Sequence, residues 1–442
     1  ENIKFSFLIK DKEYLIYNLS SLYQSVKIRS NQIKVFDNEN NFVFEGDISN
    51  QKNQIDLKKF SNLIRESFKN IINENLIIAS NSKFSFKMSK KMKFSDINFQ
   101  TKLSIEKLKF SNNNFKKFFP GYKDDIKFEN NSITIDFNNS DFEIIGKSKL
   151  NINEDIDNIN YSLKKIKKEF IYDLNFEFVN SAINFKILNY TKNKGEKSLI
   201  NINGKYLESK VINLKNIKFV QDKNSIDIQN VSFSKNKKIE SVDELKINIT
   251  NNNNKPNKLE LKKNKNNYSI TSEIFDGTKL VDEILFSKED TNFFDLFNNL
   301  NSDISIKIDT AYLNSEDYLE FLDTKLTIKN NKIFNLNLLS NFPSNDEFKV
   351  SVRTNKNEEK ITTVFTNNAK PLVKKYKFIK GFEGGELKLN SLKIKNNSRS
   401  NLKIKNFKVK EVPVLAKILT LASLQGIADL MTGEGIRFDK FE

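Results

Sequence analysis

The chain has 442 residues, and its 73 Lys and Arg against 56 Asp and Glu give a formal net charge of +17. It contains no Cys and no His, which excludes disulfides and thiolate metal sites and removes the commonest metal ligand and the usual general base. We therefore expect a protein that is not an enzyme, with no catalytic residue, metal or cofactor. The length exceeds the roughly 250–300 residues of one compact core. Because only 5 Pro and 12 Gly offer breaks, we expect one elongated architecture.

From the N-terminal part onward, the dominant pattern is alternation of apolar and polar residues, which is typical of strands with one buried face. Asn-rich segments at 112–114, 251–254 and 396–397 separate the strands, and Asn tolerates the left-handed geometry of hairpin turns. The sequence predicts a mainly β fold, a long antiparallel meander that curls into an elongated hydrophobic groove. The candidate lipid-groove residues are Phe84, Phe86, Phe99, Leu103, Ile135, Phe137, Phe176, Phe178, Ile183, Phe185, Ile306, Val350, Leu389 and Ile404.

A few short helices interrupt the predicted meander. Asp56 caps a helix expected over 57–71, and further helices are expected over 276–286, 315–322 and 368–376. So few short helices cannot cover so many strands, so the apolar face either packs on itself or meets an apolar ligand. With 39 Phe, 12 Tyr and no Trp, that face suits acyl chains better than sugars or bases, whose recognition needs placed polar groups or charge.

The C-terminal part is built differently from the strands. Pro413 suits the first turn of a helix, where its missing N–H is not needed, and apolar residues then recur at close to helical spacing over 415–431. Gly433 stands where a C-terminal cap belongs, and Gly435 lets the chain turn into a last strand. The pattern predicts a C-terminal amphipathic helix. Charged residues within it argue against a transmembrane span.

Together with the segment 378–387, this part resembles the AsmA-like C-terminal region of AsmA/TamB/YhdP-type envelope proteins of Gram-negative bacteria, which are bridge-like lipid transfer proteins. The resemblance covers residue 378 to the end of the chain, and the preceding strands match only in pattern. We divide the chain into a groove region at 1–376 and an AsmA-like C-terminal region at 377–442, incomplete at its C-terminal end. The residues that carry the resemblance are Gly384, Gly385, Pro413, Leu415, Ala422, Ser423, Leu424, Gly426, Gly433, Gly435 and Phe438.

The resemblance implies a periplasmic protein, anchored in the inner membrane by an N-terminal helix that this chain does not include, so we expect a fragment of a longer protein. It implies a long curved β-groove along which phospholipids pass between the inner and outer membranes. The expected partners are phospholipids, both membranes and other envelope proteins. The motif residues are expected to close or dock the end of the groove and to do no chemistry.

The residues are also compatible with two other functions. The first is a structural scaffold or assembly factor of the cell envelope with a dry, packed β core. The second is a nucleic-acid or polyanion binder, which the positive charge alone supports weakly, because nearly all of it is Lys and bidentate phosphate recognition favours Arg; we therefore expect no nucleic acid. The carboxylates Glu154, Asp155 and Asp157 are interpreted as a solvated turn or, at most, a weak cation site.

Overall fold

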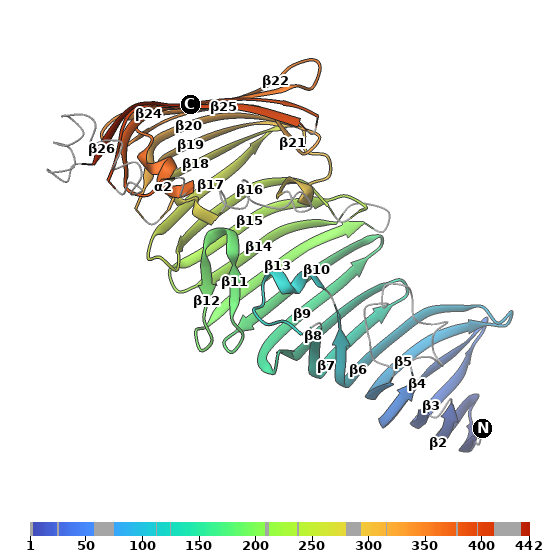
Figure 1. Ribbon diagram of the computed structural model, residues 1–442. Helices are drawn as coiled ribbons and strands as arrows, with labels where there is room; N and C mark the ends of the chain where they lie inside the picture. Colours follow the sequence, from blue (N-terminus) through green and yellow to red (C-terminus); the bar gives the residue numbers. More distant parts are fainter. Residues whose placement is uncertain are drawn as a thin grey trace. The chain divides into compact units, whose positions relative to one another are not determined.

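The protein is mainly β, which confirms the predicted class: of the residues that the structure describes, 75% lie in strands and 4% in helices. The computed structural model describes residues 3–23, 26–56, 75–111, 113–123, 125–207, 212–236, 238–279, 293–314, 316–376, 379–395, 397–410 and 435–442. Within these ranges, 24 strands belong to one large mixed sheet, and β11 and β12 form a separate two-stranded sheet. Figure 1 shows the strands following one another in chain order.

The chain divides into two compact units, the first formed by Glu1–Lys186, Thr191–Ser225 and Gln229–Lys235, the second by Ile187–Tyr190, Ile226–Ile228 and Asn236–Glu442. This division does not coincide with the boundary at residue 376 that the sequence predicts. We describe each unit by itself.

The first unit is an antiparallel meander in which each strand pairs with the next. Its strands are β1 (Lys4–Lys10), β2 (Glu13–Tyr23), β3 (Val26–Asn38), β4 (Asn41–Asp56), β5 (Asn75–Ser89), β6 (Phe94–Phe110), β7 (Ile126–Asn138), β8 (Asp141–Ile152), β9 (Asp155–Ile166), β10 (Glu169–Phe178), β13 (Ser198–Leu207) and β14 (Asn213–Gln221). Between β10 and β13 the chain forms β11 (Ile183–Phe185), η4 (Lys186–Leu188) and β12 (Tyr190–Lys192).

The second unit continues the same pattern, and β15 (Asn224–Phe233) contributes to both units. Its other strands are β16 (Ile239–Thr250), β17 (Pro256–Asn264), β18 (Asn267–Asp276), β19 (Ser302–Tyr312), β20 (Tyr318–Lys329), β21 (Lys332–Phe342), β22 (Asp346–Thr354), β23 (Lys360–Thr366), β24 (Phe382–Ile394), β25 (Asn397–Val409) and β26 (Ile436–Phe441). One pair departs from the predicted antiparallel order, because β18 and β19 run parallel. A parallel pair needs a crossover connection, and residues 277–301 provide it.

The predicted helices have different outcomes. The helix expected over 368–376 is confirmed as α2 (Lys370–Tyr376). The helix expected over 315–322 is wrong, because β20 begins at Tyr318. Its apolar residues Leu319 and Leu322 instead contact a cluster under the sheet, which explains the mistaken pattern: a bulge in β20 breaks the strict alternation there. All of 57–71 and most of 276–286 lie outside the described residues.

Asparagine provides the turn geometry that the sequence predicts. Asn139, Asn153, Asn254 and Asn330 have positive φ values of 56°, 53°, 57° and 50°, and each stands in a turn between strands or next to one. Asn accepts this left-handed conformation more readily than most side chains. The hairpins therefore close with few glycines.

Candidate functional site

One row of residues crosses seven neighbouring strands of the first unit on a single face. Each member stands directly opposite the next in the strand register, so that the side chains contact across the strands. We call this row the phenylalanine ladder, and it consists of Phe84, Phe99, Phe137, Phe142, Lys165, Phe170 and Tyr206. Six of its seven members are aromatic, and the seventh is a lysine.

Two neighbouring pairs of aromatic rings in the ladder stack closely. The ring centroids of Phe99 and Phe137 lie 4.6 Å apart with 9° between the ring planes, and those of Phe170 and Tyr206 lie 4.6 Å apart at 11°. A shorter row beside it places Phe44 against Phe86, also at 4.6 Å. Stacked pairs of this kind add roughly 0.5–1.5 kcal/mol to the burial of their area. The ladder is therefore an ordered apolar surface.

This surface is only partly covered by the protein. Phe84, Phe86, Phe99 and Phe137 are half-buried, and neighbouring Phe94 keeps 61% of its surface exposed. Contiguous apolar surface that stays in contact with water is a feature of interaction sites. The ladder and its neighbours are thus the first candidate for a binding site.

The reverse face of the same strands carries most of the charged side chains, together with single exposed apolar residues such as Ile145 and Ile171. One residue away from the ladder, Gln100, Asp136, Glu143 and Lys164 stand opposite one another on the other side of the sheet. Lys164 Nζ lies 3.9 Å from a carboxylate oxygen of Glu143. The ladder face is therefore the more apolar of the two faces, as the alternation in the sequence predicts.

A second region of the same apolar face is closed. We call it the closed cluster, and its buried residues are Phe119, Tyr122, Ile126, Leu150, Ile152, Ile159, Phe178 and Ile183. The helical turn η3 (Asn113–Lys117) with the loop after it, and β11, supply the cover. The Asn184 backbone N–H donates to the Phe118 carbonyl at 2.8 Å, which joins the two covering segments.

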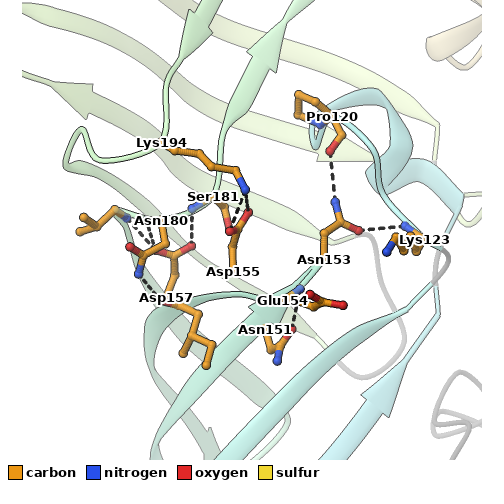
Figure 2. A network of polar contacts seen from close by, with 12 residues as sticks. Pro120, Lys123, Asn151, Asn153, Glu154, Asp155, Asp157, Asn180, Ser181 and Lys194 are labelled. Carbon is orange, nitrogen blue, oxygen red and sulfur yellow. Dashed lines mark hydrogen bonds and ion pairs between the residues drawn. The ribbon is translucent and has the colours of Figure 1, made fainter.

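A buried carboxylate fixes the cover in place. Asp157 is 2% exposed, and its oxygens accept the backbone N–H groups of Val179, Asn180 and Ser181 at 2.6, 2.8 and 2.9 Å. These three residues begin the segment that leads from β10 into β11. Figure 2 shows the carboxylate of Asp157 turned toward Asn180 and Ser181. Asp157 thus holds the start of the covering segment.

Lys192 completes this arrangement from the other side. Its side chain is fully buried, and Nζ donates to the carbonyls of Val179 and Ser181 at 2.9 and 2.8 Å. Burial lowers the pKa of Lys192, while the negative charge of Asp157 acts in the opposite direction. The two buried charges clamp the same short segment through its N–H and C=O groups.

The predicted solvated turn at 154–157 is therefore wrong for Asp157, which is buried and fully hydrogen-bonded. Asp155 pairs with Lys194 at 2.6 Å, and the Glu154 backbone N–H donates to Asn151 Oδ1 at 3.1 Å (Figure 2). Among the described residues, no group of three or more carboxylates is placed to hold a metal ion. The carboxylates of Asp155 and Asp157 thus hold the loops around the closed cluster.

The predicted groove residues of the first unit separate into three groups. Phe84, Phe86, Phe99, Leu103, Ile135 and Phe137 lie on the partly exposed face. Phe176 lies at the border and packs against the closed cluster, in which Phe178 is 2% exposed. Ile183 and Phe185 are not in the large sheet at all, since they belong to β11 in the cover. Phe178 and Ile183 are thus buried by protein and line no open groove.

In the second unit, the apolar face is more extensively packed. Ile306 and Val350 contact the cluster around Phe275 and Phe342. Leu389 packs against a cluster that α2 helps to close, and in that cluster Ile404 is 2% exposed. Ile404 is therefore also a core residue and not part of an exposed surface.

The glycines of the C-terminal part occupy demanding conformations where they are described. Gly384, Gly385 and Gly435 have φ values of 68°, 82° and 86°, which favour glycine. Gly435 precedes β26, in which the Phe438 ring stacks on Phe407 with centroids 5.2 Å apart. The other motif residues lie outside the described residues: Pro413, Leu415, Ala422, Ser423, Leu424, Gly426 and Gly433.

Sequence reasoning missed four members of the ladder: Phe142, Lys165, Phe170 and Tyr206. Each stands close to the end of its strand, where few alternating residues remain to define a face. Lys165 continues the period of Tyr161 and Leu163, but a lysine at that position is easily taken for the solvated end of a strand. The cross-strand register, which the sequence does not contain, places it between two phenylalanines.

No family model matches the chain, no curated protein matches it, and no solved structure matches it. The likeness to the AsmA-like region therefore stays a prediction from the residues. In the described part of the chain, no helix is long and apolar enough to cross a membrane.

Proposed function

We propose that the protein is a non-catalytic carrier of phospholipid, whose acyl chains lie on the apolar face of the sheet at the phenylalanine ladder. One observation carries the proposal: a partly exposed row of six aromatic residues and one lysine crosses seven strands, while most charged side chains of these strands lie on the reverse face. The ladder offers rings without a set of converging polar groups, which suits hydrocarbon better than sugars or bases.

The proposed mechanism is passive. Keeping one CH₂ group out of water is worth about 0.8 kcal/mol, so that a two-chain lipid crossing water loses on the order of tens of kcal/mol. A lipid that moves from one ladder position to the next exchanges one apolar contact for a similar one. Its burial changes little, and no catalytic residue is required. Direction and energy input come from outside this surface.

The setting follows from the resemblance of the C-terminal part. In the AsmA-like proteins, such a sheet spans the periplasm between the inner and outer membranes. We place this chain in the same setting, with phospholipids, the two membranes and other envelope proteins as partners. The proposal for the ladder stands on the sheet itself, and the proposal for the location stands on that resemblance.

A photoreactive side chain tests the ladder directly. We expect benzoylphenylalanine in place of Phe137, on the apolar face, to form a covalent adduct with phospholipid when the purified protein is incubated with vesicles and irradiated. Mass spectrometry of the protein identifies the adduct. The matched control is benzoylphenylalanine at Asp136, which is the preceding residue and stands on the polar face.

The alternative function gives the opposite result. A scaffold with a dry β core yields no lipid adduct at Phe137, Phe99 or Phe84. Equal adducts at Asp136 and Phe137 indicate nonspecific contact with vesicles and also count against the carrier. The closed cluster favours a structural role for its own region, and we therefore restrict the carrier proposal to the ladder.

A further inference from the structure

The ladder contains one charged residue, and its surroundings are unusual for a lysine. Lys165 stands directly opposite Phe142 on one side and Phe170 on the other. It is half-buried, and its Nζ lies 5.5 Å from the centroid of the Phe170 ring. A long lysine stem packs well along apolar surface while its ammonium reaches toward water. The ammonium is therefore held at the surface that we assign to acyl chains.

Lys165 has no carboxylate partner in the part of the chain that the structure describes, while nearby carboxylates have other partners. Glu143 pairs with Lys164 on the reverse face, and Glu169 pairs with Lys205 at 2.8 Å. Asp141 Oδ1 accepts the Lys167 backbone N–H at 2.7 Å. The positive charge at the ladder is thus not neutralised by an ion pair within these ranges.

Further lysines stand at the same edge of the sheet. In an antiparallel meander, the β5–β6, β7–β8 and β9–β10 hairpin turns lie at one edge. The β9–β10 turn carries Lys167 and Lys168, and the β5–β6 turn carries Lys90 and Lys91. All four are exposed. They add positive charge at the edge of the sheet next to which Lys165 stands.

We propose that Lys165 binds the phosphate group of a glycerophospholipid whose acyl chains lie on the phenylalanine ladder. The inference rests on the proposed function and names its ligand class. An ammonium group is a common point-charge ligand of phosphate, and the flanking rings limit its screening by water. A diacylglycerol has the same chains without the phosphate, so it gains nothing from Lys165.

The test compares two soluble short-chain lipids on the intact chain. Dihexanoylphosphatidylglycerol and dihexanoylglycerol are each titrated into the protein by calorimetry. We expect Lys165→Gln to weaken binding of the phosphatidylglycerol by about tenfold, as for the loss of one charge-assisted contact. Binding of dihexanoylglycerol is expected to stay unchanged. Lys165→Arg keeps the charge and is expected to retain most of the affinity.

Lys164→Gln is the matched control, because it removes the same charge one residue away on the polar face. Equal losses in Lys164→Gln and Lys165→Gln overturn the inference, since only the overall charge then matters. Inorganic phosphate is titrated as a further ligand. If phosphate alone binds as tightly as the phosphatidylglycerol, the site is one for free anions and the inference fails.

The two proposals fail in different ways. If the wild-type protein binds neither lipid, the carrier function itself is wrong. If it binds both lipids equally and Lys165→Gln changes neither, the ladder carries acyl chains but Lys165 does not recognise phosphate. The inference is supported only if the wild-type protein binds the phosphatidylglycerol more tightly than dihexanoylglycerol and Lys165→Gln loses this preference.

Discussion

The phenylalanine ladder and the closed cluster lie on the same face of the same strands, yet one is partly open and the other is sealed. Phe170 and Phe178 illustrate the difference, since both belong to β10 and point to the same side. Phe178 is 2% exposed, whereas Phe170 is half-buried. Eight residues of a strand separate them, which is about 26 Å.

The connections between strands account for this difference. Short hairpin turns join the strands beside the ladder, as at Asn139 and Ser140. At the opposite edge, longer segments follow β6 and β10 and fold back onto the sheet as η3 and β11. The apolar strand pattern is the same in both regions. What changes is whether a connecting segment is long enough to cover it.

Removing the buried carboxylate of Asp157, which holds the cover of the closed cluster, is expected to have the largest effect on stability. We expect Asp157→Ala to destabilise the first unit by about 3–5 kcal/mol, as for breaking a buried charge arrangement. The change leaves the N–H groups of Val179, Asn180 and Ser181 without their acceptor and removes the negative charge that acts most strongly on Lys192. Urea denaturation followed by circular dichroism measures the loss.

The control for this variant is Asp155→Ala. Asp155, with a side chain that is 21% exposed, pairs with Lys194, which is 63% exposed, and ion pairs in contact with water contribute only about 0–1 kcal/mol. A similar cost for the two variants contradicts the role that we give to Asp157 in holding the cover.

Truncating phenylalanines on one strand tests the contrast in packing. We expect Phe178→Ala to cost about 3 kcal/mol, since it leaves a cavity in the closed cluster. Phe170→Ala should cost about 1 kcal/mol, because much of that ring is already in contact with water. Both values come from urea denaturation. Equal costs at the two positions indicate that the ladder is packed as tightly as the cluster.

The alternation was sufficient to predict the mainly β meander and the apolar face, because period two fixes which residues share a side. It also placed Phe84, Phe99 and Phe137 together. It failed at Phe178 and Ile183, which carry the same pattern but lie under or within a cover. Whether an apolar residue is covered depends on where a long connecting segment folds onto the sheet. No local residue pattern encodes where that segment folds.

Asp157 shows the same limit for polar residues. Beside Glu154 and Asp155 it is part of an acidic, loop-like segment, and the sequence offers no sign that it is buried. Its partners Val179, Asn180 and Ser181 are more than twenty residues away. Residues that depend on distant backbone groups for their environment are therefore the ones that sequence reasoning misplaces.

Between the ladder and the closed cluster, a glycine makes room for an aromatic ring. A Cβ atom built on Gly146 would lie 2.2 Å from Cζ of Tyr161, which stands directly opposite it. We expect Gly146→Ala to displace this ring and to cost about 2 kcal/mol, as for overpacking. Thermal unfolding measures the cost. Ile144→Ala, a truncation on the same strand and face as Gly146, serves for comparison. Gly195→Ala does not serve as a control, because Gly195 has a φ of 85°.

The smallest effect on stability is expected from the titration of Tyr161, which lies at the border between the ladder and the closed cluster. Burial raises the pKa of Tyr161 above its usual value near 10, and its hydrogen bond with Ser148 offsets this in part. The unfolded chain therefore loses the tyrosine proton first as the pH rises. The stability from this group is fully present below pH 10 and is lost as the pH rises through the higher pKa of the folded state.

We expect the wild-type protein to lose more stability between pH 9 and pH 11.5 than Tyr161→Phe, in urea denaturation at each pH. An identical loss in both proteins means that the ring at the border is as accessible to water as the ladder, and the gradient of burial along the face is then absent.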